Sequence, residues 1–149
     1  GLNIAIACDI VLATHSAKFV QSFSKIGLVP DAGGTWHLPR RIGLTRALGF
    51  TLLAETLTAE QAQQAGLIWA AIPDELFLSE LERVVEQLAH APTFGLARAK
   101  RAIRAGIDSS LDEALDLERD LQKECGLSAD YAEGVNAFKE KRTPKFSNR

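Results

Sequence analysis

Strand-like runs in this chain of 149 residues are confined to its first half, and everything after them is helical. Apolar, β-branched runs at 10–13 and 17–20 predict two strands, and the run at 67–72 predicts a third. From residue 76 onward, apolar residues recur only at helical spacing. Two or three strands cannot close a sheet domain by themselves. We therefore expect an α/β chain that is mainly α and that forms part of a larger fold.

The first residues favour the same interpretation. The sequence starts with the apolar segment Gly1-Leu2-Asn3-Ile4-Ala5 and contains no methionine. Natural termini are usually polar and loosely held, whereas a cut through buried structure would leave an end of this kind. We expect an N-terminal portion to be missing.

Capping signals place several helices. Thr58 followed by Gln61 is a capping box, and the helix that it opens should stop at Gly66. Gly43 interrupts the helical pattern and predicts two helices that meet at a bend. The remaining helices are expected over 76–90 and 93–105, and from Ser110 and Ser128 onward.

Composition excludes several classes of protein. With 46% hydrophobic and 24% charged residues, the chain can bury a core. A net charge of −2 without a basic, aromatic-interleaved stripe argues against nucleic acid as a partner. The longest apolar runs fall far short of the roughly 20 residues of a membrane span.

Cys8 and Cys125 lack CxxC spacing, and His15, His37 and His90 lack metal-ligand spacing. We expect reduced thiols, no metal and a cytoplasmic location.

The segment 26–36 is dense in turn formers and predicts a loop. Its Pro30-Asp31 and Gly33-Gly34 pairs allow the backbone to bend tightly and to approach a ligand closely. Asp31 is the one carboxylate of this loop. From turn chemistry alone, it could simply cap the following helix or bend the turn.

Four segments together resemble the crotonase superfamily of enoyl-CoA hydratases and isomerases, in family order and across essentially the whole chain. They are residues 1–9, 17–19 with 30–35, 57–67 and 131–142. The resemblance implies the C-terminal part of a spiral of ββα units in residues 1–73. It also implies a helical oligomerisation or cap region in residues 74–149, which would build homo-trimers or hexamers.

The chemistry that this family shares is stabilisation of a thioester enolate. Fixed hydrogen-bond donors must hold the oxyanion, and one such donor can be worth roughly 2.7–4 kcal/mol. The resemblance implies one main-chain donor in the missing portion and another immediately before Gly1, so that the first helix would point its positive end at the oxyanion. The substrate would be an acyl-CoA, with coenzyme A as part of it and no separate cofactor. We expect the isolated chain to be inactive.

Two positions argue against hydration. Hydratases of the family carry glutamates where this chain has Asn3 and Phe23, and neither side chain can act as a base. Isomerases of the family place an acid at the position of Asp31, and one base is enough for a 1,3-proton shift. Leu28, Phe23 and Trp36 are expected to desolvate that carboxylate.

The resemblance also suggests binding residues. Asn3, Phe23 and Trp36 would line an acyl pocket suited to an aromatic ring, as in the isomerases that act on ring-epoxides of aromatic acyl-CoA esters. It is equally plausible that both aromatics are ordinary core residues. Phe138 and Lys141 match positions that contact the CoA nucleotide of a neighbouring subunit, although a solvated basic tail explains Lys141 as well.

Three alternatives stay open. The chain could belong to an enoyl-CoA hydratase of the same superfamily. It could use Asp31 as a nucleophile, as aroyl-CoA dehalogenases do, but those carry their tryptophan before the aspartate whereas Trp36 follows it. It could also be a non-catalytic oligomerisation fragment, given its long amphipathic helices.

Overall fold

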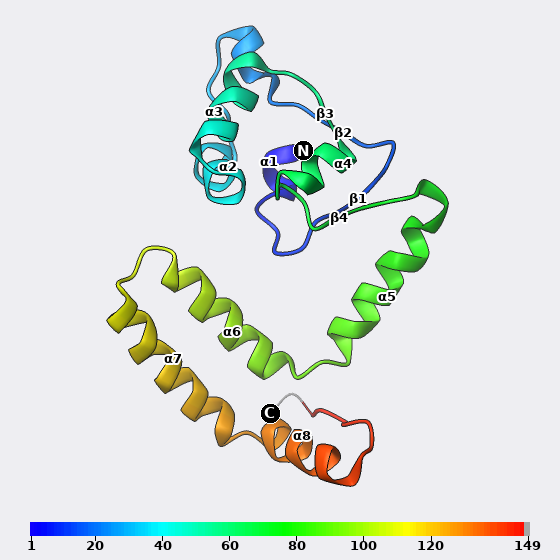
Figure 1. Ribbon diagram of the computed structural model, residues 1–149, viewed down its shortest axis with the longest axis vertical. Helices are drawn as coiled ribbons and strands as arrows, with labels where there is room; N and C mark the ends of the chain where they lie inside the picture. The colour runs from blue at the N-terminus through cyan, green and yellow to red at the C-terminus, as the bar shows by residue number, and fades with distance from the viewer. Residues whose placement is uncertain (148–149) are drawn as a thin grey trace. The chain divides into compact units, whose positions relative to one another are not determined.

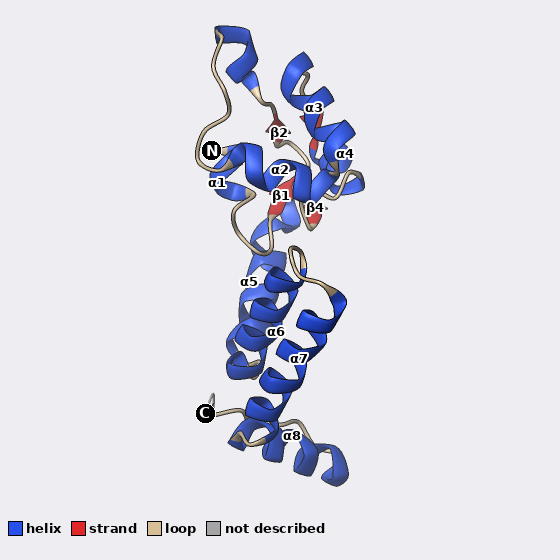
Figure 2. Cartoon of the chain, turned by 90° about the vertical axis from the view of Figure 1, so that its left-hand side faces the viewer, coloured by secondary structure: helices blue, strands red, loops and turns tan. Residues whose placement is uncertain are grey.

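The computed structural model describes residues 1–147, which fall into two compact units, 1–82 and the part of the chain that starts at Arg83 (Figure 1). Helices dominate both units, and the strands are short (Figure 2). The expectation of an α/β chain that is mainly α is confirmed. The division at residues 73 and 74 into a spiral core and an oligomerisation region stays a prediction.

The strands of the first unit form two separate pairs. They are β1 (Leu12–Thr14), β2 (Lys18–Phe19), β3 (Leu57–Thr58) and β4 (Ala70–Ile72). β1 pairs with β4 in parallel, and β2 pairs with β3 antiparallel. The sequence predicted three longer strands and missed β3. The predicted strand at 67–72 is shorter because Leu67 closes the preceding helix, its N–H donating to the Ala62 carbonyl at 2.9 Å.

The helices of the first unit begin and end close to the predicted signals. They are α1 (Leu2–Ala5), the 3₁₀ helix η1 (Ser22–Ile26), α2 (Gly34–Ile42), α3 (Leu44–Leu53), α4 (Ala59–Gln64), the 3₁₀ helix η2 (Asp74–Leu76) and α5 (Phe77–Ala89), which continues past residue 82. Gly43, at φ 77°, separates α2 from α3 as predicted. The capping box is confirmed, since Thr58 Oγ1 accepts from the Gln61 N–H at 3.2 Å and Gln61 Oε1 accepts from the Thr58 N–H at 2.9 Å.

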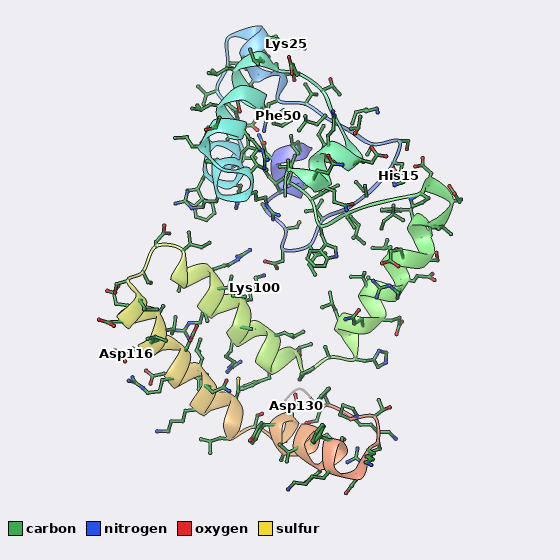
Figure 3. The ribbon with its side chains drawn as sticks, in the orientation of Figure 1. His15, Lys25, Phe50, Lys100, Asp116 and Asp130 are labelled. Carbon is green, nitrogen blue, oxygen red and sulfur yellow. The ribbon has the colours of Figure 1, made fainter. Side chains whose placement is uncertain are left out.

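A single apolar cluster holds the first unit together. Its largest members come from α1, β2, α2, α3 and the turn after α4, and they are Ile6, Phe19, Leu38, Ile42, Phe50 and Leu67. Figure 3 labels Phe50 on α3. Arg41 ties the end of α1 to α2, because its guanidinium donates to the carbonyls of Ile6, at 2.8 Å, and of Cys8. These carbonyls lie at and just beyond the C-terminal end of α1, where a helix leaves its carbonyls without a partner, so the arginine satisfies them.

The second unit is a helical hairpin followed by a shorter helix. α6 (Thr93–Gly106) packs along α7 (Leu111–Gly126), and α8 (Ala129–Glu140) follows. Ser110 caps α7 in a capping box with Glu113. An open groove of about 670 Å³ lies between α6 and α7, next to Ile103 and Leu115.

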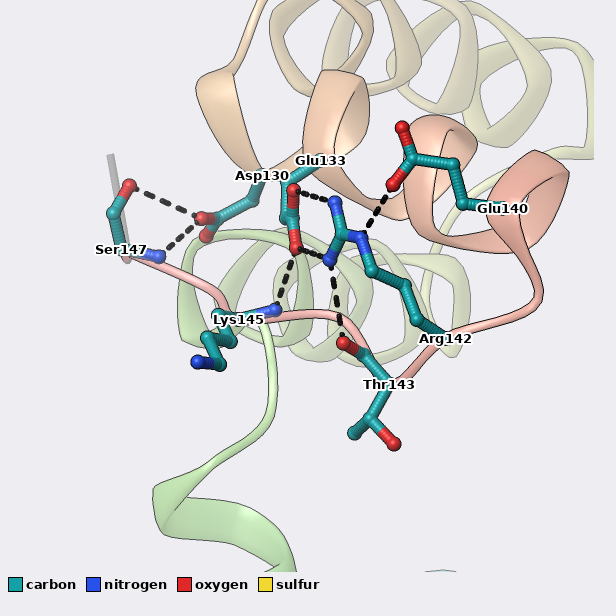
Figure 4. A network of polar contacts seen from close by, with 7 residues as sticks. All are labelled: Asp130, Glu133, Glu140, Arg142, Thr143, Lys145 and Ser147. Carbon is teal, nitrogen blue, oxygen red and sulfur yellow. Dashed lines mark hydrogen bonds and ion pairs between the residues drawn. The ribbon is translucent and has the colours of Figure 1, made fainter.

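The segment after α8 folds back onto that helix (Figure 4). Arg142 donates to both carboxylate oxygens of Glu133, at 2.6 and 2.9 Å, and the Lys145 N–H donates to the same carboxylate at 2.7 Å. Together the two donors, Arg142 above all, lower the pKa of Glu133 from its ordinary 4.5 to about 2. The Ser147 N–H donates to the buried Asp130 carboxylate at 2.7 Å. The basic tail is therefore anchored by the acids of α8.

Large apolar side chains remain exposed on the helices from α5 onward. They include Leu78, Val85, Ile103, Tyr131 and Phe138. These residues are candidates for the expected subunit contacts. The oligomeric state stays a prediction.

Candidate functional site

The loop between η1 and α2 has a strained backbone where it reaches α2. Gly27, at φ 73°, ends η1, and Gly33, at φ 75°, begins α2. Between them, Ala32 also adopts a positive φ, of 46°. A residue with a Cβ pays roughly 1–2 kcal/mol for this left-handed conformation. Strain of this kind is found most often at functional sites, and here it lies directly after Asp31.

The Asp31 carboxylate is exposed and uncommitted. Within residues 1–147, no hydrogen bond or ion pair involves its side chain. Gly33 is the N-cap of α2, and no side chain caps that helix. The alternative that Asp31 caps the helix is therefore wrong. Its main-chain carbonyl, by contrast, is fixed by two donors: the Gly34 N–H at 2.8 Å and Asn3 Nδ2 at 3.0 Å.

The expected apolar enclosure of Asp31 is not formed by this chain. Leu28 is 58% exposed and Trp36 is 51% exposed, while Phe23 is half-buried. Asp31 itself is exposed. The prediction that these three neighbours desolvate the carboxylate is therefore wrong for residues 1–147, because the loop lies on the surface of the first unit.

Asn3 lies inside the protein, at only 4% exposure. Its side-chain nitrogen donates to the Asp31 carbonyl, and its side-chain oxygen accepts from Gln21 Nε2 at 2.5 Å. A carbonyl can only accept a hydrogen bond, so the carboxamide has one orientation that fits both partners. The expected role of Asn3 as a pocket-lining residue stays a prediction, but both ends of its carboxamide are used within the chain.

Gln21 was not predicted as part of this arrangement, and Gly34 was predicted only as a glycine of the tight loop. Gln21 is 1% exposed, directly before η1. Gly34 lies against Asn3, since a Cβ on Gly34 would meet the Asn3 carboxamide at 2.5–2.6 Å. A glutamine at the end of the apolar run 17–20 was the available sequence signal for a satisfied buried polar group.

The two aromatic residues of the predicted pocket differ in their surroundings. The Phe23 carbonyl accepts from the Leu28 N–H at 2.9 Å, which ties η1 to the loop. Trp36 lies in the first turn of α2 with the Arg40 guanidinium 4.1 Å above its ring and His37 edge-on at 4.8 Å. One face of the indole is therefore occupied, and within the described chain no ring contact joins it to Phe23.

The remaining predicted residues lie at helix ends. Gly1 is the exposed N-cap of α1, which has four residues. The expected role of its positive end toward the oxyanion stays a prediction. Phe138 is 86% exposed, and Lys141 is the exposed left-handed C-cap of α8. Both belong to the second unit, and their role in binding CoA stays a prediction.

Residues 1–147 offer neither a metal site nor a membrane span. No cluster of three or more His, Cys, Asp or Glu side chains could hold a metal ion there. Nor does that part of the chain contain a helix with the length and apolarity to span a membrane.

Comparison with known proteins defines the class. The sequence profile of the enoyl-CoA hydratase/isomerase family matches residues 1–149, and the chain belongs to this family. It is 50% identical over its whole length to the 1,2-epoxyphenylacetyl-CoA isomerase of Escherichia coli strain K12, covering 57% of that protein. It is 49% identical to a protein of Rhodobacter capsulatus described as a probable enoyl-CoA hydratase, covering 58% of it. These relatives are enzymes of the crotonase family.

Solved structures give the same fold. The enoyl-CoA hydratase of Bacillus anthracis superposes with a TM-score of 0.95 at 32% identity, over all of this chain and 58% of that one. The chain thus spans less than three fifths of the length of these relatives. The matches do not support the expectation that it is specifically the C-terminal part of such an enzyme.

Proposed function

We propose that this sequence belongs to an acyl-CoA isomerase that works through a thioester enolate, with Asp31 as its single proton carrier. Asp31 would remove a proton α or γ to the thioester and return it to another carbon. One carboxylate is sufficient, because the same group is base in the first step and acid in the second. The resemblance implies main-chain N–H donors for the oxyanion, one of them beside Gly1.

The observation that carries this proposal is the contrast between Asp31 and Asn3. The Asp31 carboxylate has no partner within residues 1–147 and is held by a firmly bonded backbone. Asn3 cannot take up a proton, and both ends of its carboxamide are engaged. Phe23 carries no titratable group. A mechanism with one acid therefore fits these residues better than hydration, which needs two carboxylates.

The substrate that we propose is 1,2-epoxyphenylacetyl-CoA, converted to its oxepin, or an enoyl-CoA whose double bond shifts. The support is the 50% identity to the isomerase of Escherichia coli. Phe23 and Trp36 would pack against the aromatic ring of the substrate. The 49% identity to the Rhodobacter capsulatus protein favours the second candidate, an enoyl-CoA hydratase.

Product analysis distinguishes the two. The full-length native protein is incubated with 1,2-epoxyphenylacetyl-CoA, with a 3-enoyl-CoA and with a 2-enoyl-CoA, and the products are identified by mass spectrometry. An isomerase returns products of unchanged mass, whereas a hydratase adds one water. Predominant hydration of the 2-enoyl-CoA would reject the isomerase proposal.

The base is tested by Asp31→Asn. We expect turnover to fall by about 10²–10⁴-fold, the usual contribution of a positioned acid or base. Binding of the acyl-CoA, measured by calorimetry, should be preserved because the change is isosteric. Glu55→Gln is the matched control, since Glu55 is an exposed carboxylate of the same unit. Near-normal turnover of Asp31→Asn would contradict the assignment.

A further inference from the structure

A buried pair of amide side chains connects the Asp31 loop to the rest of the first unit. Gln21 Nε2 donates to Asn3 Oδ1 at 2.5 Å, and Asn3 Nδ2 donates to the Asp31 carbonyl at 3.0 Å. The two side chains are 1% and 4% exposed. A continuous series of hydrogen bonds thus links Gln21, the N-cap of η1, through Asn3 of α1 to the main chain of Asp31.

The Asp31 backbone depends on this chain. Its carbonyl accepts only two hydrogen bonds within the described residues, from Asn3 and from the Gly34 N–H at 2.8 Å. The Gly34 contact is local to the turn, whereas Asn3 anchors the turn to a different helix. The left-handed Ala32 that follows would relax if the turn were free. Asn3 therefore fixes where the strained turn lies relative to the core.

Packing alone does not explain why the Asn3 and Gln21 side chains are buried. Buried amides destabilise a protein unless every polar atom has a partner, and an apolar side chain could fill the same volume. Here Gly34 is kept without a Cβ, so that the Asn3 carboxamide can lie against the first turn of α2. The arrangement uses two amides and a glycine to hold one carbonyl.

We propose that Asn3 and Gln21 are positioning residues, which set the Asp31 carboxylate for proton transfer without touching the substrate. This inference rests on the proposed function of Asp31. A displacement of about 1 Å at a reacting group can lower turnover by about 10²-fold. Loss of the pair should therefore reduce kcat while leaving KM for the acyl-CoA nearly unchanged.

The test uses Asn3→Asp in the full-length native protein. Aspartate keeps the shape of asparagine, and its ionised carboxylate can still accept from Gln21 but cannot donate to the Asp31 carbonyl. We expect kcat to fall by about 10- to 100-fold. Gln21→Leu removes the Nε2 donor to Asn3 and should lower kcat by a smaller factor. In the variant that carries both changes, kcat should fall by less than the product of the two factors.

Two readouts separate positioning from general damage. Thr58→Ala serves as the control, since it removes a helix cap of the same unit with no bond to the Asp31 loop. It should lower the free energy of unfolding by about 1 kcal/mol and leave kcat unchanged. Hydrogen exchange of the Gly34 amide, which is bonded to the Asp31 carbonyl, should accelerate in Asn3→Asp and not in Thr58→Ala.

Each outcome has one meaning. Reduced kcat with faster Gly34 exchange in Asn3→Asp alone supports the proposal. Normal kcat in Asn3→Asp, while Asp31→Asn is inactive, overturns the positioning role and leaves the proposed function intact. Full turnover of Asp31→Asn overturns both. If kcat falls equally in Thr58→Ala and in Asn3→Asp, the effect comes from general destabilisation, and the proposal is overturned.

Discussion

Gly34→Ala is the substitution for which the structure gives the sharpest expectation. The new Cβ would lie 2.5–2.6 Å from three atoms of the Asn3 carboxamide, whereas ordinary contact begins at 3.4 Å. The carboxamide would have to retreat by about 1 Å, and it is held at both ends by hydrogen bonds. Overpacking of a filled interior costs about 1–3 kcal/mol, and breaking one of those bonds adds about 1 kcal/mol. We expect a loss of about 2–4 kcal/mol.

Urea unfolding followed by tryptophan fluorescence measures this loss, because Trp36 and Trp69 both lie in the first unit. Gly49→Ala is the matched control: its Cβ would meet nothing within 4 Å, and it should be stabilising by about 0.5–1 kcal/mol inside α3. Asn3→Ala combined with Gly34→Ala should cost less than the two changes added together, since the first opens space for the second. A loss below 1 kcal/mol in Gly34→Ala, or full additivity with Asn3→Ala, would refute the reasoning.

Two further predictions concern stability. Thr58→Ala removes the N-cap of α4 and should lower the free energy of unfolding by about 1 kcal/mol, measured by the same urea titration; an unchanged value would contradict the role of the capping box. The pKa of Glu133 is lowered from 4.5 to about 2 in the folded protein, so its contribution to stability is present above pH 4.5 and is lost as the pH falls toward 2. Arg142→Gln should flatten this acid dependence when unfolding is followed by circular dichroism, and identical pH profiles would rule out the pairing as its cause.

Local signals predicted much of the fold. The capping box at Thr58, the start of a helix at Ser110 and the break at Gly43 appear where sequence rules placed them, because each depends on interactions within a few residues. β3 was missed because two residues leave no periodicity to detect and because its partner, β2, lies far away in the sequence. Strand pairing across such distances depends on tertiary contacts.

The chemistry of the candidate site stays a prediction, and only part of its construction could be predicted from the sequence. The turn-rich loop and its lone carboxylate at Asp31 were visible in the sequence. The use of Asn3 as an anchor for the Asp31 carbonyl was not, since the contact joins residues 28 positions apart. Burial was also misjudged: hydrophobic neighbours in sequence, such as Leu28 and Trp36, extend into solvent around Asp31.

The parallel pairing of β1 with β4 has a consequence for the order of folding. The ladder, together with the bond from the Ser16 N–H to the Asp74 carboxylate 58 residues later, closes a segment that contains the whole Asp31 loop. Closing so long a segment is entropically costly and slow compared with forming the helices inside it. During synthesis, the Asp31 loop would therefore take its final geometry only after residue 74 has left the ribosome, however early α2 and α3 begin to form.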